Sequence, residues 1–195
     1  MSKKLSITTA DYLTWDQNLN LIRKLIDDNE YRIALLISFG SFWGLRISDI
    51  LRIRWIDVFD KNEFDLVEGK TQKSREIRIN VQLQKHIHSC YDAIKPATLE
   101  EPIFLSQKKT IFSIQRVNVL LKEIKSRYGL KIRNFSSHSL RKTFGREVFE
   151  ASGTSAELSL VKLCQLFNHS NTAITRRYLG IAHEELMQTY DILKF

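Results

Sequence analysis

Apolar positions recur with two different periods along the chain, and they divide it into helical and strand-forming stretches. Near the beginning, apolar residues three and four positions apart predict amphipathic helices. One following stretch is apolar on nearly every side and predicts a buried helix, which Gly44 ends. In chain order these first segments are a short helix from near Ala10 capped by Thr8 or Thr9, then 19–28, 31–43 and 46–53.

Strict alternation of apolar and polar residues follows and predicts short strands. The expected strands are 55–59, 64–68 and 76–81, joined by turns at 60–62 and 69–74. Helical spacing then returns to the end of the chain, with Ser113 as a helix cap and Pro96 as a helix stop. The later helices are expected at 83–94, from 114 onward, and at 139–151, 157–167, 172–178 and 184–193. The order predicts an α+β fold, mostly helical with a small three-stranded antiparallel sheet.

The charge is concentrated in the middle of the chain. The 195 residues carry 30 Lys and Arg against 22 Asp and Glu, a formal net charge of +8. Residues 70–150 hold 17 of the basic residues and only 7 of the acidic ones, so they carry the whole excess. A basic segment of this kind favours a polyanionic partner and indicates a surface that faces phosphate groups.

Composition excludes several other classes of protein. Two cysteines, Cys90 and Cys164, are too few for a disulfide framework and are expected to be reduced. The longest apolar stretch, 33–42, is interrupted and far shorter than a membrane span, and no apolar leader follows the initial Met. We therefore expect a cytoplasmic protein, located at the nucleoid if it binds DNA.

Five polar clusters are candidates for chemistry. Each has an ordinary explanation when taken alone. In chain order these are Arg46 as a helix-end arginine pairing with Asp49, Lys70 as a solvent-exposed lysine, His138 and Arg141 as a surface pair, His169 as a helix cap, and Tyr178 as a half-buried tyrosine. The clusters are Gly44–Asp49 with Arg46, Gly69–Arg75 with Lys70, His138–Arg141, Asn168–Ser170 with His169, and Arg177–Leu179 with Tyr178.

Taken together, the clusters suit chemistry at a phosphodiester. The arginine fork matches phosphate oxygens, and fixed cations stabilise the charge that develops on five-coordinate phosphorus. A tyrosine hydroxyl is a possible nucleophile, and a lysine can protonate a departing oxygen. No cluster of carboxylates suggests a metal, and we expect no cofactor.

These motifs resemble, in order and spacing, those of the tyrosine recombinases, also called phage-integrase-type recombinases. Gly-Leu-Arg-Ile-Ser-Asp at 44–49 resembles the family's first arginine box, and Lys70 resembles its lysine between two strands. His-Ser-Leu-Arg at 138–141 resembles the His-x-x-Arg box, while 166–170 resembles the Leu-Gly-His-Ser segment, with Tyr178 nine residues after His169. The resemblance runs from about residue 8 to about 190.

The resemblance implies the catalytic domain fold of that family and a role for each residue. Tyr178 would attack a DNA phosphate to give a 3′-phosphotyrosyl link, and Arg46 and Arg141 would hold the nonbridging oxygens. The remaining roles are implied as follows: His138 assists proton movement, His169 hydrogen-bonds the phosphate, and Lys70 protonates the leaving 5′-oxygen. Neither metal nor ATP would be needed.

The sequence departs from the family pattern in three places. Asn168 stands where relatives carry glycine, and asparagine tolerates the left-handed backbone such a turn requires. Lys73 lies near Lys70, although Lys70 matches the family position. Residues 1–195 would form one catalytic domain without the N-terminal core-binding or arm domain, and 179–195 would form a C-terminal tail helix that folds back or docks on another copy.

The implied partner is double-stranded DNA, bound by a homotetramer that exchanges strands through a Holliday junction and is monomeric when free. An accessory DNA-bending factor is a possible further partner. Three alternatives stay open: a type IB topoisomerase-like enzyme, a non-catalytic DNA-binding protein, and a metal site made by His86, His88 and Cys90 if that segment were a strand.

Overall fold

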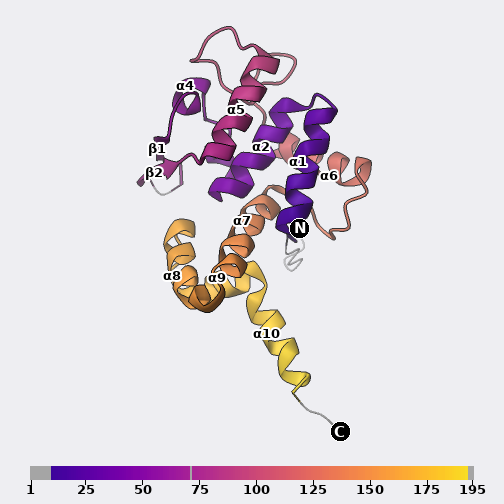
Figure 1. Cartoon of the computed structure of the whole chain (residues 1–195), viewed down its shortest axis with the longest axis vertical. Coiled ribbons are helices and arrows are strands. Elements are labelled where there is room, and N and C mark those ends of the chain that lie inside the picture. The colour runs from indigo at the N-terminus through magenta and orange to yellow at the C-terminus, as the bar shows by residue number, and fades with distance from the viewer. Residues whose placement is uncertain (1–9, 71, 193–195) are drawn as a thin grey trace, which may run out of the picture.

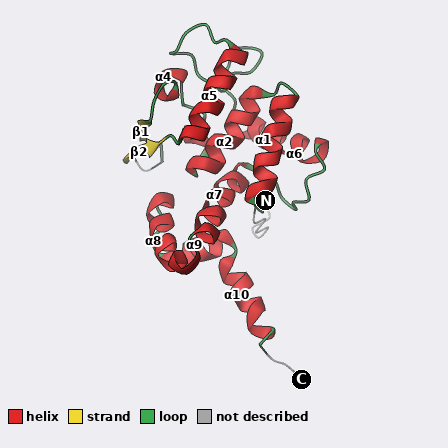
Figure 2. Ribbon diagram, in the orientation of Figure 1, coloured by secondary structure: helices red, strands yellow, loops and turns green. Residues whose placement is uncertain are grey.

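Helices make up most of the fold, and one two-stranded sheet interrupts them (Figure 2). The computed structural model describes residues 10–70 and 72–192. Its elements are α1 (Trp15–Asp27), α2 (Tyr31–Trp43), α3 (Ile47–Ile50), α4 (Trp55–Val58), β1 (Glu63–Val67), β2 (Ser74–Arg78), α5 (Val81–Ile94), α6 (Ile114–Arg127), α7 (Ser137–Ala151), the 3₁₀ turn η1 (Gly153–Ser155), α8 (Ala156–Phe167), α9 (Thr172–Leu179) and α10 (Ile181–Tyr190). The expected mostly helical α+β class is confirmed.

Helix α2 is the centre of the main core, as its apolar sequence predicts. It packs against α1, α5 and α7 (Figure 1). Ser41, buried on α2, accepts a hydrogen bond from the Asn18 side-chain amide at 2.9 Å. The approach to α7 is close: a Cβ built at Gly40 would lie 2.6 Å from the Leu140 Cβ. This contact fixes α7 beside the end of α2, where the candidate site begins.

Within residues 10–70 and 72–192 the sheet has two strands, not the three that the sequence predicted. β1 and β2 pair antiparallel, with Leu66 opposite Arg75. The expected first strand, 55–59, is instead the short helix α4, because Trp55 and Val58 are both buried three residues apart. The Asp57 carboxylate accepts the Arg54 backbone N–H at 2.8 Å and caps this turn. A buried pair at that spacing fits a helical turn better than a strand.

Several boundaries also differ. Residues 10–14 are not helical, so the expected helix near Ala10 is wrong, and its candidate caps, Thr8 and Thr9, lie outside the described residues. Helix α1 begins at Trp15, where the Thr14 side chain accepts the Gln17 N–H. Helix α3 is shorter than the expected 46–53.

A second, smaller core joins α8, α9 and the start of α10. It consists of Leu160, Leu163, Phe167, Leu179 and Ile181. Beyond Ile181 the described residues of α10 are exposed, and the helix extends away from the body (Figure 1). The predicted C-terminal helix therefore exists with shifted ends, and residues 193–195 of that prediction lie outside the described part.

None of the helices in the described part of the chain is both long and apolar enough to span a lipid bilayer.

Candidate active site

Two helices end at the site, and both ends use a left-handed residue. Gly44 (φ +59°) ends α2, and a Cβ there would lie 2.3 Å from the Phe144 ring. Asn168 (φ +52°) ends α8, so the expectation that asparagine replaces glycine in this turn is confirmed. Carbonyl groups at a helix C-terminus carry partial negative charge and attract cations. Three arginines satisfy these carbonyls.

Arg141 joins the two helix ends from α7. Its guanidinium donates to the Gly44 carbonyl at 2.6 Å and to the Phe167 carbonyl at 3.0 Å. It also lies 4.3 Å from the centre of the Phe167 ring. The residue is 6% exposed, and burial lowers its pKa to about 10, so it remains charged at neutral pH.

Arg46 begins α3 directly after the Gly44 turn. Its guanidinium donates to the Glu68 carboxylate at 2.6 Å and to the same Phe167 carbonyl at 3.4 Å. Because Arg46 and Arg141 share this acceptor, their charged groups lie side by side. The pattern of the sequence suggested Asp49 as the partner of Arg46, but Asp49 instead accepts from Arg52 and from the Gly69 N–H.

Sequence reasoning missed two charged residues of the site, Glu68 and Arg75. The Arg75 guanidinium donates to the Leu166 carbonyl at 3.1 Å and lies 3.9 Å from the Glu68 carboxylate. A signal for both was present, because each continues the inward-facing alternation of a strand. Glu68 follows Phe64 and Leu66, and Arg75 precedes Ile77. Charged residues at inward positions are rare unless paired.

His169 follows the Asn168 turn and faces α9. Its Nδ1 lies 3.0 Å from the Thr175 hydroxyl, and its backbone N–H donates to the Cys164 carbonyl. Burial and the charges of Arg141 and Arg46 lower the pKa of His169 below its ordinary value. The imidazole is therefore neutral at pH 7. In the tautomer in which Nδ1 accepts from the Thr175 hydroxyl, Nε2 carries the proton and is the donor.

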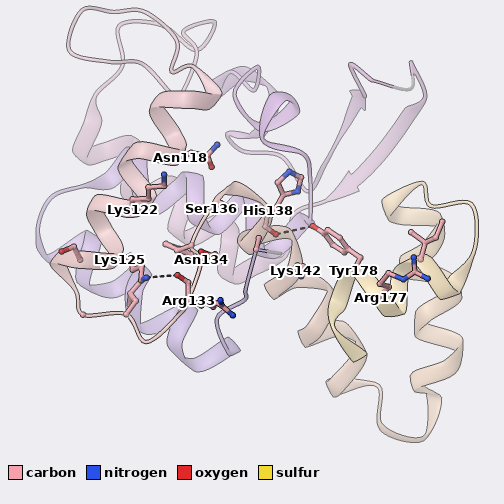
Figure 3. A pocket seen from close by; sticks show the side chains of 16 residues that line it. Asn118, Lys122, Lys125, Arg133, Asn134, Ser136, His138, Lys142, Arg177 and Tyr178 are labelled. Atoms are coloured by element: carbon pink, nitrogen blue, oxygen red, sulfur yellow. Dashed lines mark hydrogen bonds between the residues drawn. The ribbon is translucent and has the colours of Figure 1, made fainter. Parts of the chain in front are cut away.

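Tyr178 lies on α9 and faces the arginines. Its ring makes edge-on contacts with His169 and Phe167, at centroid distances of 5.4 and 5.5 Å. Its hydroxyl donates to the His138 backbone carbonyl at 3.4 Å (Figure 3). Burial raises the pKa of Tyr178 to about 12, while the charges of Arg141 and Arg46 oppose that shift. The hydroxyl is protonated at neutral pH and needs a base to become a nucleophile.

His138 stands in the first turn of α7 with its side chain exposed. Desolvation lowers its pKa, as do the nearby charges of Arg141 and Lys142. The Tyr178 hydroxyl bonds to the backbone of this same residue, and a neutral imidazole is able to accept a proton. Lys142 contributes a further cation, with its ammonium 5.3 Å from the centre of the Tyr178 ring.

Lys70 is exposed in the turn between β1 and β2. That turn is tied to the site on two sides: the Gly69 N–H donates to Asp49 at 3.0 Å, and Lys73 donates to the Asn168 side chain at 3.2 Å. Lys73 is therefore engaged with the α8 end, whereas the expected residue, Lys70, stands at the outer part of the turn.

An open groove borders Tyr178. It has a volume of about 1350 Å³ and runs between α6, the segment before α7, and α9. Its basic lining residues are Lys122, Lys125, Arg133, Lys142 and Arg177, and His138 and Tyr178 stand at its α7–α9 end (Figure 3). A basic groove leading to the tyrosine fits an extended polyanion better than a small ligand.

The structure thus gathers five of the six predicted residues around Phe167. Arg46 and Arg141 share an acceptor, the ring of His169 meets that of Tyr178, and Tyr178 reaches the backbone of His138. Lys70 belongs to the adjoining turn.

The alternative metal site is wrong. His86 and Cys90 lie one turn apart on helix α5, with His86 Nδ1 3.7 Å from the Cys90 sulfur, while His88 pairs with Asp60. Among the residues that the structure describes, no group of three or more His, Cys, Asp or Glu side chains is placed to hold a metal ion.

Comparison with known proteins identifies the family. The phage integrase family is matched over residues 11–185. The chain is 32% identical over 178 residues to the probable integrase/recombinase YoeC of Bacillus subtilis (strain 168), covering 90% of this chain and 92% of that protein. It is 26% identical to the tyrosine recombinase XerC of Caldanaerobacter subterraneus subsp. tengcongensis, over 96% of this chain and 52% of the relative. The chain thus spans about half the length of its XerC relatives.

Solved structures share the fold. The XerA recombinase is similar over the whole chain and 68% of its own length, with a TM-score of 0.71 and 19% identity. The Tn1549 transposon integrase, solved with transposon right end DNA, is similar over 95% of this chain and 68% of its own, with a TM-score of 0.71 and 17% identity. The motifs, the fold and the sequence relatives agree: this chain belongs to the phage integrase family and has the catalytic-domain fold of the tyrosine recombinases.

Proposed function

We propose that this protein is a site-specific DNA recombinase that cleaves and rejoins DNA through a covalent link to Tyr178. The observation that carries the proposal is the position of Tyr178: its ring packs against that of His169, its hydroxyl reaches the His138 backbone, and the charges of Arg141 and Arg46 act on it. Solved proteins of this fold were captured on DNA, among them XerH on its difH substrate. The basic groove beside Tyr178 is the surface that supports DNA binding here.

The two arginines bind the scissile phosphate. Arg141 and Arg46 are held by the Phe167 carbonyl on one edge, which leaves other N–H groups to reach the nonbridging oxygens. Such prearranged donors stabilise the charge that develops on five-coordinate phosphorus. His169 adds a neutral donor through Nε2.

Cleavage transfers the phosphorus from a deoxyribose oxygen to tyrosine. The Tyr178 oxygen forms a bond to phosphorus and its proton passes to His138, which has the lowered pKa that a neutral acceptor needs. The bond from phosphorus to the 5′-oxygen breaks, and Lys70 protonates that oxygen. The products are a 3′-phosphotyrosyl link and a free 5′-hydroxyl.

Rejoining reverses these steps with a new strand. The 5′-hydroxyl of the partner strand attacks the phosphotyrosine, and Tyr178 leaves and regains its proton. Bond energy is conserved in the tyrosyl ester, so the reaction consumes no ATP. In the proposed mechanism the guanidinium groups of Arg46 and Arg141 supply the positive charge at phosphorus in place of a metal ion. Four protomers on two duplexes would exchange strands in turn through a Holliday junction, and an accessory DNA-bending factor would act on the DNA rather than in this site. This function places the protein in the cytoplasm, at the nucleoid.

Helix α10 is the surface we assign to protomer contacts. Its apolar side chains Leu186, Met187 and Tyr190 are 43–67% exposed. Ion pairs from Arg146 to Glu184 and from Arg176 to Glu185 hold the first turns of α10 against α7 and α9. An exposed apolar stripe on a helix with a fixed base suits docking on a second copy. The free protein would be monomeric and assemble on DNA.

A covalent trap tests the proposed function. The protein is incubated with fragmented genomic DNA in EDTA, denatured with SDS, and examined for DNA-linked protein. We expect an adduct from the wild type and none from Tyr178→Phe, with equal non-covalent DNA binding by both. Tyr190→Phe is the matched control and should form the adduct normally, because Tyr190 is exposed on α10.

Other outcomes identify the rival functions. Salt-dependent DNA binding with no adduct from any variant would indicate a non-catalytic DNA-binding protein. An adduct accompanied by relaxation of supercoiled DNA, without exchange between two trapped sites, would indicate a topoisomerase. An adduct formed only when divalent metal is present would contradict the metal-independent mechanism.

A further inference from the structure

Three guanidinium groups and one carboxylate form a charge cluster at the centre of the site. We call Arg46, Arg75, Arg141 and Glu68 the arginine cluster. All four side chains are buried or mostly so: Glu68 is 4% and Arg141 6% exposed, and the side chains of Arg46 and Arg75 are 22% and 19% exposed. Burial strengthens the interactions between such charges because water screens them less.

Glu68 is the acidic member, and it lies between two of the arginines. One carboxylate oxygen lies 2.6 Å from Arg46, and the other lies 3.9 Å from Arg75. Burial lowers the pKa of Arg75, and so does the charge of Arg46, while the carboxylate of Glu68 opposes both effects. Without the carboxylate, two guanidiniums would repel each other in a poorly hydrated position.

The backbone of Glu68 also frames the turn that carries Lys70. Its N–H donates to the Lys73 carbonyl at 3.0 Å, and its carbonyl accepts from the Gln72 N–H at 2.8 Å. The residue therefore connects the base of the lysine turn to Arg46 of the phosphate site. A shift of the Glu68 side chain would affect Arg46, and a shift of its backbone would affect the turn.

The charges of the cluster match the reaction. Three guanidiniums and one carboxylate leave two net positive charges. A phosphodiester carries one negative charge and the five-coordinate state carries two, so the cluster is neutralised only in the transition state. A cluster without the carboxylate would attract anions more strongly in the ground state and in the transition state alike, so the contribution of Glu68 to the rate lies in how its carboxylate orients Arg46 and Arg75.

We propose that Glu68 is a positioning residue: its buried carboxylate holds Arg46 and Arg75 in place and sets the net charge of the phosphate site. The part of this inference that concerns catalysis rests on the proposed function. The part that concerns anion binding stands on the contacts of Glu68 alone.

Glu68→Gln is the informative substitution because it keeps the shape and removes the charge. A glutamine has one oxygen for two arginines, and its NH₂ group would face a guanidinium. The matched control is Glu76→Gln, which removes a carboxylate from an exposed position on β2. Circular dichroism and thermal melting verify folding of each variant.

Inorganic sulfate measures the charge of the cluster without DNA. By titration calorimetry at low ionic strength, we expect Glu68→Gln to bind sulfate at least about fivefold more tightly than wild type, and Glu76→Gln to remain within about twofold. In the covalent trap, Glu68→Gln should form adduct at least about tenfold more slowly while binding DNA at least as well as wild type.

The double variant Glu68→Gln/Arg75→Gln restores two net charges and keeps the proposal testable if the single variant does not fold. We expect its sulfate affinity to return to within about twofold of wild type. A double variant that also fails to fold would overturn the charge-setting role, because Glu68 would then act through packing.

Two results overturn the proposal: unchanged sulfate affinity in a folded Glu68→Gln, or adduct formation within about twofold of wild type. If the wild type forms no adduct, the proposed function fails, and the sulfate measurements still decide whether Glu68 sets the charge of the cluster.

Discussion

At the scale of single residues, Arg141 connects the ends of α2 and α8. It is held by carbonyls from two helix ends and by the Phe167 ring. A lysine has one ammonium where arginine has a planar fork, so it cannot make both bonds and contact phosphate as well. We expect Arg141→Lys to slow adduct formation roughly a hundredfold with little loss of DNA binding.

The covalent trap with purified variants measures this effect. Arg23→Lys, at an exposed position on α1, is the control and should behave as wild type. Adduct formation by Arg141→Lys at the wild-type rate would show that the bidentate geometry is unimportant.

The pH dependence of cleavage tests the role of His138. The pKa of His138 lies below its ordinary value of 6.5, and only the neutral imidazole can accept the Tyr178 proton. Protonation as the pH falls removes that acceptor, so the initial adduct rate at subsaturating DNA should be flat above neutrality and fall below about pH 6.5. His138→Gln should be slow and lack this acid limb. A limb centred above pH 7 would contradict the assignment.

At the scale of elements, helix ends decide where the reactive groups lie. The left-handed Asn168 ends α8 and directs the chain to His169, and its side chain accepts from Lys73. We expect Asn168→Gly to change the free energy of unfolding by only a few tenths of a kcal/mol, because glycine adopts this conformation freely. Asn168→Ala should destabilise the fold by about 1–2 kcal/mol. Urea unfolding of both variants measures the difference, and equal stabilities would contradict a strained turn.

The sequence pattern predicts most helices because their buried faces recur at helical spacing, and it fails where an element is short. Helix α4 has a single turn, and four of the five residues at 55–59 are apolar, so the sequence alone does not show that Trp55 and Val58 are the buried pair. The hydrogen bond from the Arg54 backbone N–H to the Asp57 carboxylate stabilises the helical turn.

The six motif residues were recognisable from order and spacing, whereas the contacts of Glu68 and Arg75 were not. Glu68 directly follows β1 and pairs with Arg46 at the start of α3, while Arg75 on β2 bonds to α8, and only the tertiary fold brings these together. The same holds for Arg46, whose sequence neighbour Asp49 is not its partner.

At the scale of the whole molecule, the part of α10 after Ile181 stands apart from both cores. Replacing Leu186 and Met187 by serine should leave the melting temperature and the binding of one protomer to DNA unchanged, because both side chains are exposed. It should abolish the assembly of several protomers on one DNA. Analytical ultracentrifugation of protein–DNA mixtures distinguishes the species. Normal assembly by this variant would place the protomer contacts elsewhere.

In the proposed reaction Tyr178 becomes bonded to DNA, and mass spectrometry of the trapped adduct identifies the bonded residue. Trypsin cleaves after Arg177 and Lys194, so one peptide contains both Tyr178 and Tyr190, and fragment ions must separate them. After nuclease digestion, we expect a 3′-linked nucleotide remnant on Tyr178. A remnant on Tyr190, or on any residue outside this peptide, would contradict it.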